Sequence, residues 1–173
     1  EVIIADDGTK DVYQSKISEI IQNCHYPVTH VYQKDQGFRL SRIRNLAATK
    51  AKGDYLIFLD GDCVPRKSFI ENHRKLAQKG FVVAGNRICL SEKFTKFVTD
   101  NQVSIWNYSM CKWIKVFFSK GLSRLHPLIN LPYFQKLRNL NNKWKKVRGC
   151  NFALYKDAFF GVDGCDSAFE GWG

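Results

Sequence analysis

Two aspartates separated by one glycine, Asp60 and Asp62, are the residues whose type and spacing most directly predict chemistry. They follow residues 55–59, an unbroken apolar run typical of a strand that is covered on both faces of a parallel sheet. Hard divalent cations such as Mg²⁺ and Mn²⁺ prefer carboxylate oxygens, and a bound diphosphate can supply further ligands. The Asp60-Gly61-Asp62 turn therefore predicts a site for a metal ion that neutralises charge on a departing phosphate group.

A second acidic pair, Asp6 and Asp7, directly follows another apolar run at residues 2–5. Ligands of a parallel sheet bind beyond the carboxyl ends of its strands. We therefore expect Asp6, Asp7 and the Asp60-Gly61-Asp62 turn to lie together at one edge of one sheet.

Strand-like and helix-like segments alternate through residues 1–90. Short apolar runs predict strands at residues 2–5, 28–32, 55–59 and 81–84. Apolar residues at helical spacing predict helices at residues 11–24, 41–52 and 65–78, with Asp11 capping the first. In the first helix the apolar residues that follow the helical period are Tyr13, Ile17, Ile20, Ile21 and Cys24. In the second helix we expect Ile43, Leu46 and Ala47 to face inward. The alternation predicts an α/β fold with a mostly parallel sheet flanked by helices.

The net charge of +11 is concentrated in one part of the chain. Residues 101–156 contain no Asp or Glu and eleven Lys or Arg residues, which equals the whole positive excess. Such a block of one sign indicates an anionic partner. Its aromatic residues among lysines predict either a patch on an anionic membrane or a packed core beneath solvated lysines. The residues concerned are Trp106, Tyr108, Trp113, Phe117, Phe118, Lys112, Lys115 and Lys120.

The six cysteines contain no CxxC pair and the four histidines do not cluster with them, so we expect no zinc site. The pattern favours reduced thiols and a cytoplasmic protein. No apolar run approaches the roughly 20 residues of a membrane-spanning helix, and no secretory signal is visible. Because the chain opens directly on a core strand, we expect a further strand of the fold to precede Glu1.

Taken in order, several motifs resemble the GT-A glycosyltransferases of family 2, which have a Rossmann-like α/β fold. The motifs are Asp6-Asp7-Gly8-Thr9, Gln33-Lys34-Asp35-Gln36-Gly37, Arg44-Asn45-Leu46-Ala47, Asp54-Tyr55 and Leu59-Asp60-Gly61-Asp62. Residues 33–65 are similar to bacterial chondroitin-polymerase-type transferases. Residues 149–173 resemble a C-terminal module shared with the β-1,4-galactosyltransferases.

The resemblance implies one domain made of three consecutive segments. Residues 1–90 would be the nucleotide-binding half. Residues 91–146 would be a helical, basic and aromatic segment, in which helical spacing runs from Phe94 to Tyr108. Residues 147–173 would be a module on the donor-sugar and acceptor side, beginning with a strand at 147–155 and ending in a glycine-rich loop.

The resemblance also implies roles for single residues. Asp7, or else Asp6, would hydrogen-bond the uracil edge, and Arg44 would lie near the nucleotide unless it is a solvated helix charge. Asp60 would contact ribose or metal, and Asp62 would bind Mn²⁺ or Mg²⁺. Further roles concern Arg39 and Arg42, as additional nucleotide contacts or surface charges, and Asn151, in the sugar pocket or in a turn.

The glycine-flanked tryptophan of Gly171-Trp172-Gly173 resembles the mobile loop that closes over donor and acceptor in the galactosyltransferases. The alternative is a tryptophan that anchors the edge of the domain. The family pattern places the general base just after Gly173, and Glu170 is the candidate within this chain. Cys165 stands where the family has an aromatic residue.

The resemblance implies a metal-dependent inverting transfer from a UDP-sugar to a glycan or lipid-linked glycan acceptor. The product would be a bacterial capsule, lipopolysaccharide or other polysaccharide, made in the cytoplasm or peripherally on the inner face of the cell membrane. One alternative is a non-catalytic nucleotide-sugar-binding module. The other is a basic nucleic-acid-binding protein, which leaves the two acidic strand ends unexplained, so we expect no nucleic-acid partner.

Overall fold

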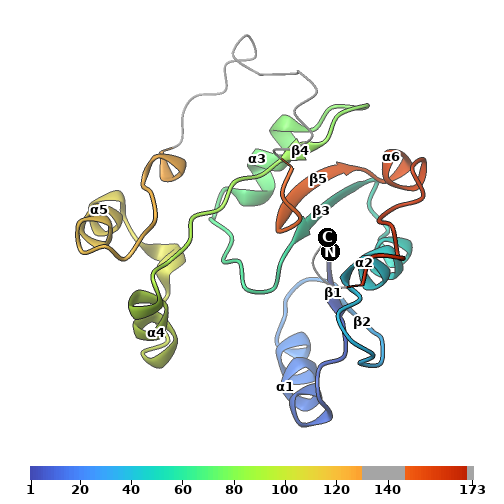
Figure 1. Cartoon of the computed structure of the whole chain (residues 1–173), viewed down its shortest axis with the longest axis horizontal. Helices are drawn as coiled ribbons and strands as arrows, with labels where there is room; N and C mark the ends of the chain where they lie inside the picture. The colour runs from blue at the N-terminus through green and yellow to red at the C-terminus, as the bar shows by residue number, and fades with distance from the viewer. Residues whose placement is uncertain (130–146, 171–173) are drawn as a thin grey trace. The chain divides into compact units, whose positions relative to one another are not determined.

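The computed structural model describes residues 1–129 and 147–170, and it confirms the α/β class (Figure 1). In chain order the strands are β1 (Val2–Asp6), β2 (Val28–Tyr32), β3 (Tyr55–Leu59), β4 (Val83–Ala84) and β5 (Asn151–Tyr155). The helices are α1 (Asp11–Gln22), α2 (Leu40–Lys50), α3 (Phe69–Leu76), α4 (Glu92–Asp100), α5 (Met110–Phe118) and α6 (Lys156–Phe160). Two short 3₁₀ turns, η1 (Ile105–Asn107) and η2 (His126–Leu128), complete the described elements.

The strands form two sheets, which corrects the expectation of one. β1 pairs with β2 in parallel, from Val2 opposite Val28 to Asp6 opposite Tyr32. The other sheet has the order β3-β5-β4, with β4 antiparallel to β5. The two acidic turns therefore follow strands of different sheets. The sequence did not predict this, because a local apolar pattern shows where a strand forms but not which strand it pairs with.

The chain divides into two compact units, and each is built from separate stretches of sequence. The first unit contains residues 1–56, 78–81 and 154–173, and the second contains residues 57–77 and 82–153. These units do not follow the three consecutive segments of the sequence-based division, which stays a prediction.

In the first unit, α2 packs on β1 and β2. Its buried residues are Ile43, Ala47 and Ala48, and Ile43 is completely inaccessible to solvent. Ile43 and Ala47 are four positions apart and fall on one face of this helix, which was predicted at residues 41–52. The helix thus holds the two strands at whose ends Asp6 and residues 33–39 lie.

The C-terminal stretch of this unit is tied to α2 by one asparagine. Asn45 Nδ2 donates to the Cys165 carbonyl oxygen over 2.7 Å, and Cys165 N–H donates to Asn45 Oδ1 over 2.8 Å. Gly164 lies beside this pair with a φ of +74°, and a Cβ there would come within 2.6 Å of Asn45 Oδ1. The bend before Cys165 therefore requires glycine.

In the second unit, β4 and β5 pair through Val83 opposite Ala153 and Ala84 opposite Phe152. Phe152 stacks on Phe58 of β3, with ring centroids 4.6 Å apart and an interplanar angle of 11°. Burial of these apolar side chains stabilises the sheet that carries the Asp60-Gly61-Asp62 turn.

Serine caps begin both helices of the basic segment. Ser91 Oγ accepts a hydrogen bond from Phe94 N–H at the start of α4, and Ser109 Oγ accepts one from Lys112 N–H at the start of α5. The helical spacing predicted from Phe94 to Tyr108 is interrupted, since α4 ends at Asp100 and Gln102 adopts a left-handed φ of 50°.

Other element boundaries also differ from the sequence-based expectation. Lys10, rather than Asp11, occupies the capping position of α1, and no residue of α1 is buried. Tyr13 and Ile20 of α1 are more than half exposed. In α2, Ile43 and Ala47 are buried as expected, but the inward position expected for Leu46 is wrong, since its side chain is 38% exposed. The predicted strand at residues 147–155 begins only at Asn151, because an isolated bridge between Arg148 and Asn151 makes a turn there.

All six cysteines lie in the described ranges, and all are free thiols. Among the described residues, no helix is long and apolar enough to cross a membrane.

Candidate donor and metal site

The Asp60-Gly61-Asp62 turn starts where β3 ends. Asp60 N–H donates to the Cys150 carbonyl oxygen over 3.1 Å, and Cys63 N–H donates to the Asp60 carbonyl oxygen over 3.0 Å. The first bond ties the turn to the residue before β5, and the second closes the turn. Asp60 is half-buried and Asp62 is exposed, so the carboxylate of Asp62 is accessible to a ligand from solvent.

Cys63 is the residue that contacts the Asp62 carboxylate. Its Sγ lies 3.5 Å from Asp62 Oδ1. Burial raises the pKa of the Cys63 thiol to about 12, and the hydrogen bond to Asp62 adds to the rise. The thiol is therefore protonated at neutral pH and acts as a weak donor to Asp62.

The donor set of this turn fits a metal ion that shares its ligands with a substrate. Within residues 1–129 and 147–170, no three or more His, Cys, Asp or Glu side chains gather as a closed metal site. Mg²⁺ is commonly bound through one or two carboxylates, with the remaining ligands coming from waters and substrate phosphates. Asp60 and Asp62 would hold Mn²⁺ or Mg²⁺ in this way, and the ion would supply positive charge beside a diphosphate.

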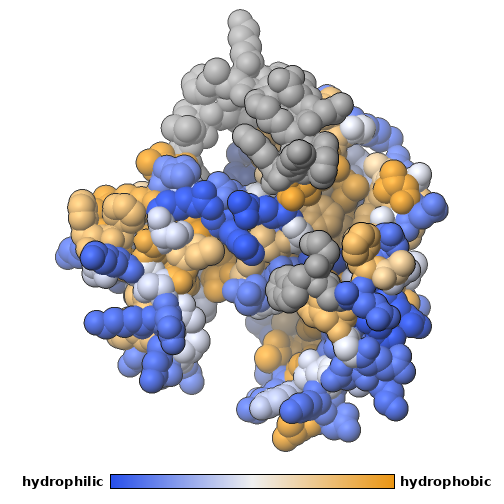
Figure 2. Space-filling model, viewed as in Figure 1, coloured by the Kyte–Doolittle hydropathy of each residue, from blue (hydrophilic) through white to orange (hydrophobic). Residues whose placement is uncertain are grey.

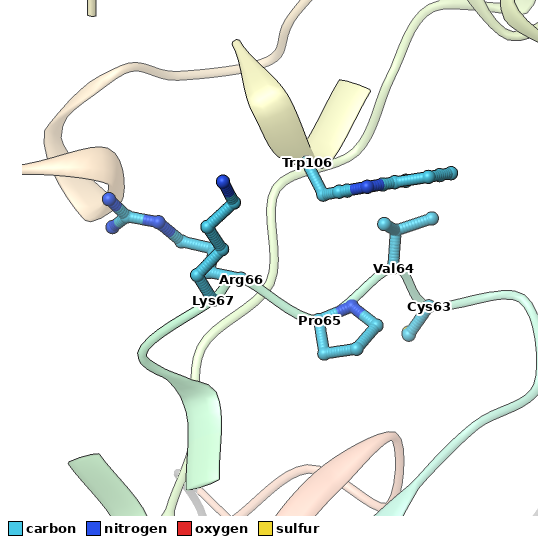
Figure 3. Close-up of a pocket in the computed structure, with 6 residues that line it drawn as sticks. All are labelled: Cys63, Val64, Pro65, Arg66, Lys67 and Trp106. Atoms are coloured by element: carbon cyan, nitrogen blue, oxygen red, sulfur yellow. The ribbon is translucent and has the colours of Figure 1, made fainter. Parts of the chain in front are cut away.

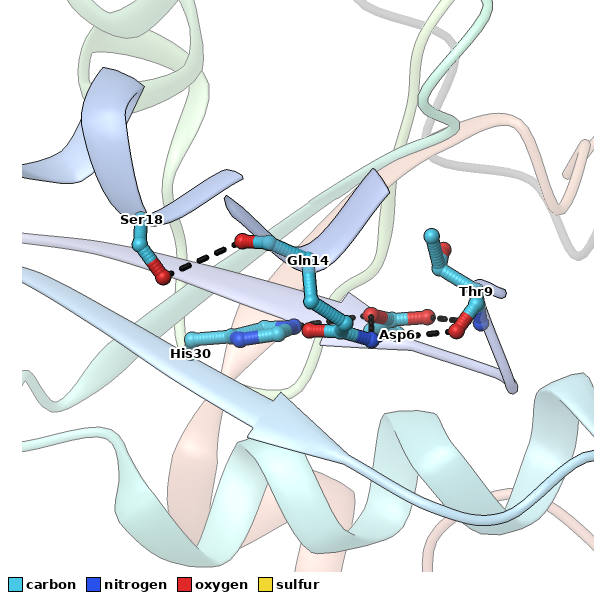
Figure 4. Close-up of polar contacts among 5 residues, drawn as sticks. All are labelled: Asp6, Thr9, Gln14, Ser18 and His30. Carbon is cyan, nitrogen blue, oxygen red and sulfur yellow. Dashed lines mark hydrogen bonds and ion pairs between the residues drawn. The ribbon is translucent and has the colours of Figure 1, made fainter. Parts of the chain in front are cut away.

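Asp6 is the most buried of the acidic candidates, at 5% exposure. Its Oδ1 accepts from Thr9 N–H over 2.8 Å, and its Oδ2 lies 2.8 Å from His30 Nε2 and 3.4 Å from Gln14 Nε2 (Figure 4). Burial alone would raise the pKa of Asp6, but the hydrogen bonds from Thr9 and His30 together lower it. The carboxylate is therefore ionised and engaged within the fold, where it positions the turn after β1.

Asp7 joins three segments of the first unit. Its Oδ1 accepts from Gln33 Nε2 over 2.5 Å, and its Oδ2 accepts from Arg39 N–H over 2.7 Å. Gln33 follows β2 and Arg39 precedes α2, so the Asp7 carboxylate fixes the loop between them. Asp7 is half-buried, which leaves it the more accessible member of the pair. Its predicted contact with uracil stays a prediction.

The turn after Asp7 depends on Gly8. Its φ is +93°, and a Cβ there would lie 2.6 Å from the Asp35 Cα. Both the left-handed backbone and the close approach of the 33–39 loop exclude a side chain. Gly61 differs, because a Cβ there would meet no heavy atom within 4 Å.

The three arginine candidates differ in their surroundings. Arg44 is half-buried on α2, and its positive charge opposes the rise that burial causes in the pKa of Cys165. Arg39 is bound to its own loop, through Nη1 to Gln36 Oε1 at 2.8 Å and Nη2 to the Lys34 carbonyl oxygen at 2.5 Å. Arg42 is exposed. The nucleotide contacts predicted for these three arginines stay predictions.

Asn151, predicted either for the sugar pocket or for a turn, is buried at the start of β5. Its Nδ2 donates to the Asn86 carbonyl oxygen over 3.2 Å, and its Oδ1 lies 3.0 Å from His73 Nε2. A Cβ on Gly85 would overlap the Asn151 side chain at 2.1 Å. These contacts give Asn151 a structural role in the second unit.

The remaining predicted residues lie near the C-terminus. Glu170 is exposed, and no described contact orients it toward a substrate. Gly171, Trp172 and Gly173 lie outside the described residues, so their roles stay predictions.

The structure brings in residues that sequence reasoning had not assigned to the site. Gln33 and His30 contact the acidic pair from 26 and 24 positions away, and His73 contacts Asn151 from 78 positions away. The sequence could have indicated Gln33, because it is the first residue after β2, the strand that runs parallel to β1. The sequence could not have indicated His73, because a single histidine in a helix forms no recognisable motif.

A family model, Glycosyl transferase family 2, matches residues 1–160. Two chondroitin synthases align with the whole chain: that of Escherichia coli is 28% identical over 194 positions, and that of Pasteurella multocida strain Pm70 is 24% identical over 188. The chain spans 26% and 18% of these relatives. A hyaluronan synthase of Pasteurella multocida is 35% identical over 75 positions, covering 42% of the chain and 7% of that protein. Because the family model matches most of its length, the chain belongs to glycosyl transferase family 2.

Proposed function

We propose that this chain is the donor-binding part of a metal-dependent inverting glycosyltransferase that moves a sugar from a UDP-sugar to a hydroxyl of a glycan. Membership of the family supports a nucleotide-sugar donor and a glycan acceptor in general. The observation that carries the finer proposal is the exposed Asp62 carboxylate at the end of β3. With the half-buried Asp60, it offers carboxylate ligands beside an open surface.

In the proposed reaction the acceptor oxygen attacks the anomeric carbon on the face opposite the nucleotide. The bond to the acceptor forms as the bond to UDP breaks, so the configuration inverts, and UDP leaves with the electron pair. A general base takes the proton of the acceptor hydroxyl. Within the chain, the candidate for that base is Glu170, which is exposed.

The donor site is tested by calorimetric titration of UDP with and without Mn²⁺, on the wild type and on Asp62→Asn. We expect Mn²⁺-dependent binding that weakens at least about tenfold in the variant, because a metal ligand is lost. Asp100→Asn, at an exposed aspartate that ends α4, is the matched control. Equal UDP affinity with and without Mn²⁺ would remove the metal from the proposal.

Assays on the same purified protein distinguish the two alternative functions. UDP binding without sugar transfer would favour a non-catalytic nucleotide-sugar-binding module. Salt-sensitive binding of arbitrary DNA would favour the nucleic-acid alternative, which we do not propose, because carboxylates at the two strand ends repel phosphate in the absence of a metal.

The relatives' name, chondroitin synthase, supports a polysaccharide as the product. We propose that it is a bacterial capsular polysaccharide or lipopolysaccharide, built on a glycan or lipid-linked glycan acceptor. Synthesis would then take place in the cytoplasm or on the inner face of the cell membrane. Transfer from radiolabelled UDP-sugars to oligosaccharide acceptors would identify the donor sugar.

A peripheral membrane location is supported by α5. Its exposed apolar residues are spaced at helical intervals on one face: Met110, Ile114, Phe117 and Phe118, the last being 79% exposed. Figure 2 shows hydrophobic side chains gathered where α5 lies in Figure 1. The lysines of α5 add positive charge suited to anionic lipids. Tyr108 and Trp113 instead pack on each other, with ring centroids 5.3 Å apart.

The membrane proposal is tested by sedimentation with vesicles of phosphatidylglycerol and phosphatidylcholine. We expect binding that increases with the anionic lipid fraction and falls several-fold in Phe118→Ser. Phe97→Ser, which removes a half-exposed phenylalanine of α4, is the control. Equal sedimentation with and without anionic lipid would rule the proposal out.

A further inference from the structure

A pocket of about 460 Å³ directly follows the Asp60-Gly61-Asp62 turn and adjoins the proposed donor site (Figure 3). A separate pocket of about 420 Å³ lies within the first unit, where β3 begins. The acidic turn follows the other end of β3, so the two sites share no residue. We propose that the pocket at the start of β3 is a non-catalytic saccharide-binding site, which holds a segment of the glycan chain outside the transfer site. The proposal rests on the proposed function, which supplies the glycan.

Two aromatic side chains give this pocket flat apolar surfaces. Tyr155 ends β5 and is half-buried, and Phe160 ends α6 and is 39% exposed. The Tyr155 ring packs edge-to-face on Tyr55, with ring centroids 5.1 Å apart, which fixes its position. A pyranose ring presents C–H groups on its faces, and these groups pack well on an aromatic ring that has little conformational freedom to lose. The pocket therefore offers two surfaces for sugar rings.

A lysine ammonium lies over each of these rings. Lys79 Nζ is 5.8 Å from the centroid of the Tyr155 ring, and Lys156 Nζ is 5.9 Å from that of Phe160. Lys156 is held in place, because its Nζ also donates to the Ala51 carbonyl oxygen over 2.6 Å. A sugar carries oxygens around the rim of its ring, and an ammonium donates hydrogen bonds to such oxygens. An ammonium beside an aromatic ring therefore matches both the rim and the face of one sugar.

Two aspartates make the pocket unsuited to a compact anion. Asp54 and Asp157 line it, and both are exposed. Carboxylates repel a compact dianion such as phosphate at short range. They also accept hydrogen bonds from hydroxyl groups, which a saccharide carries on most of its carbons. With Lys52 as a third lysine of the lining, the pocket combines donors and acceptors for hydroxyl groups.

Hydrogen bonds within the first unit fix the backbone around the pocket. Lys156 N–H donates to the Asp54 carbonyl oxygen over 2.8 Å, which joins the start of β3 to the end of β5. Glu1 Oε1 accepts from Lys52 N–H over 2.7 Å and from Gly53 N–H over 2.9 Å. A site whose backbone is already ordered loses little conformational freedom when a ligand binds.

The test locates the saccharide by acetylation of lysines in the full chain, read by mass spectrometry, with and without an unsulfated chondroitin hexasaccharide. The hexasaccharide should slow acetylation of Lys79 about threefold or more, which corresponds to occupancy of about two-thirds of the sites. Lys16 is the matched control, because its Nζ lies 5.7 Å from the centroid of the Tyr13 ring, a similar pair on α1 outside the pocket. Its acetylation should not change. Inorganic phosphate at the same concentration should protect neither lysine.

Phe160→Ala should raise the hexasaccharide concentration needed for half-protection of Lys79 about tenfold, as the loss of an aromatic anchor commonly does. Phe160→Tyr keeps a ring and should retain most of the protection, which separates loss of the aromatic surface from misfolding. Tyr13→Ala removes a half-exposed ring outside the pocket and should leave the protection unchanged. None of these variants should change the affinity for UDP with Mn²⁺.

An unchanged acetylation rate of Lys79 in the presence of the hexasaccharide would overturn the proposal. Equal slowing at Lys16, equal protection by phosphate, or full protection in Phe160→Ala would overturn it as well. Failure of the proposed function has a different signature. UDP would then not bind the wild type in the presence of Mn²⁺, whatever happens at Lys79.

Discussion

His73 Nε2 and Asn151 Oδ1 lie 3.0 Å apart, so a side chain of α3 fixes the amide that begins β5. The Asn151 Nδ2 donates to the Asn86 carbonyl oxygen, which leaves Oδ1 to accept from His73. His73 therefore carries its proton on Nε2, and its buried Nδ1 has no hydrogen-bond partner in the described structure. This neutral, buried histidine makes stability depend on pH.

Burial lowers the pKa of His73 below its ordinary value of 6.5, and the hydrogen bond with Asn151 only partly opposes this. In the unfolded chain His73 is protonated as pH falls through 6.5, whereas in the folded chain it is protonated only at a lower pH. The contribution of neutral His73 to the free energy of unfolding is thus fully present above pH 6.5. It is lost as pH falls toward the lower pKa that His73 has in the folded chain. Urea unfolding from pH 8 to pH 5 should show a smaller loss of stability in His73→Gln. The other three histidines are common to both proteins, and parallel pH curves would contradict the role of His73.

Asp6 should control stability in a more acidic range. Its pKa lies below the ordinary 3.8 in the folded chain. Its contribution is therefore present above pH 3.8 and is lost as pH falls through the folded value. Asp6→Asn should reduce the free energy of unfolding at pH 7 by about 1–3 kcal/mol, because a buried charged hydrogen-bond partner is lost. Asp163→Asn, at an exposed residue whose φ of 60° suits asparagine, is the control. An unchanged denaturation midpoint at pH 7 would be inconsistent with the Asp6 network.

Three glycine-to-alanine variants should separate backbone strain from steric overlap. Gly8 has a positive φ and lies against the Asp35 backbone, Gly37 has a positive φ in open space, and Gly61 has neither constraint. Gly37→Ala should lose about 1–2 kcal/mol from the left-handed conformation alone. Gly8→Ala should lose more, and Gly61→Ala should stay within about 0.5 kcal/mol of the wild type. A different order in denaturant unfolding would contradict the described contacts of Gly8.

Asp7 should affect UDP binding more than folding. Asp7→Ala removes the acceptor of Gln33 Nε2 and Arg39 N–H. We expect UDP affinity to fall about tenfold, the size of one lost hydrogen bond to a charged group. Gln33→Ala keeps the Asp7 carboxylate but removes one of its supports, so its effect should be smaller. If Asp7→Ala lowered stability and left UDP affinity unchanged, Asp7 would serve only to hold the 33–39 loop.

The sequence by itself determined the fold class and the place of the acidic turns. The apolar run of β3 and the helical spacing of α2 are local patterns, and local patterns survive any arrangement of the rest of the chain. The Asp60-Gly61-Asp62 turn follows β3 as predicted, because a strand ends where apolar residues give way to acids and glycine. The family motifs were readable for the same reason.

Only the tertiary structure decided which residues those acids contact. The residues paired with Asp6, Asp7 and Asn151 are His30, Gln33 and His73, all distant along the chain. The division into two sheets and the exposed face of α1 were also decided by packing. A sequence specifies residue type and local period, whereas contacts between distant residues depend on how the elements bury one another's surfaces.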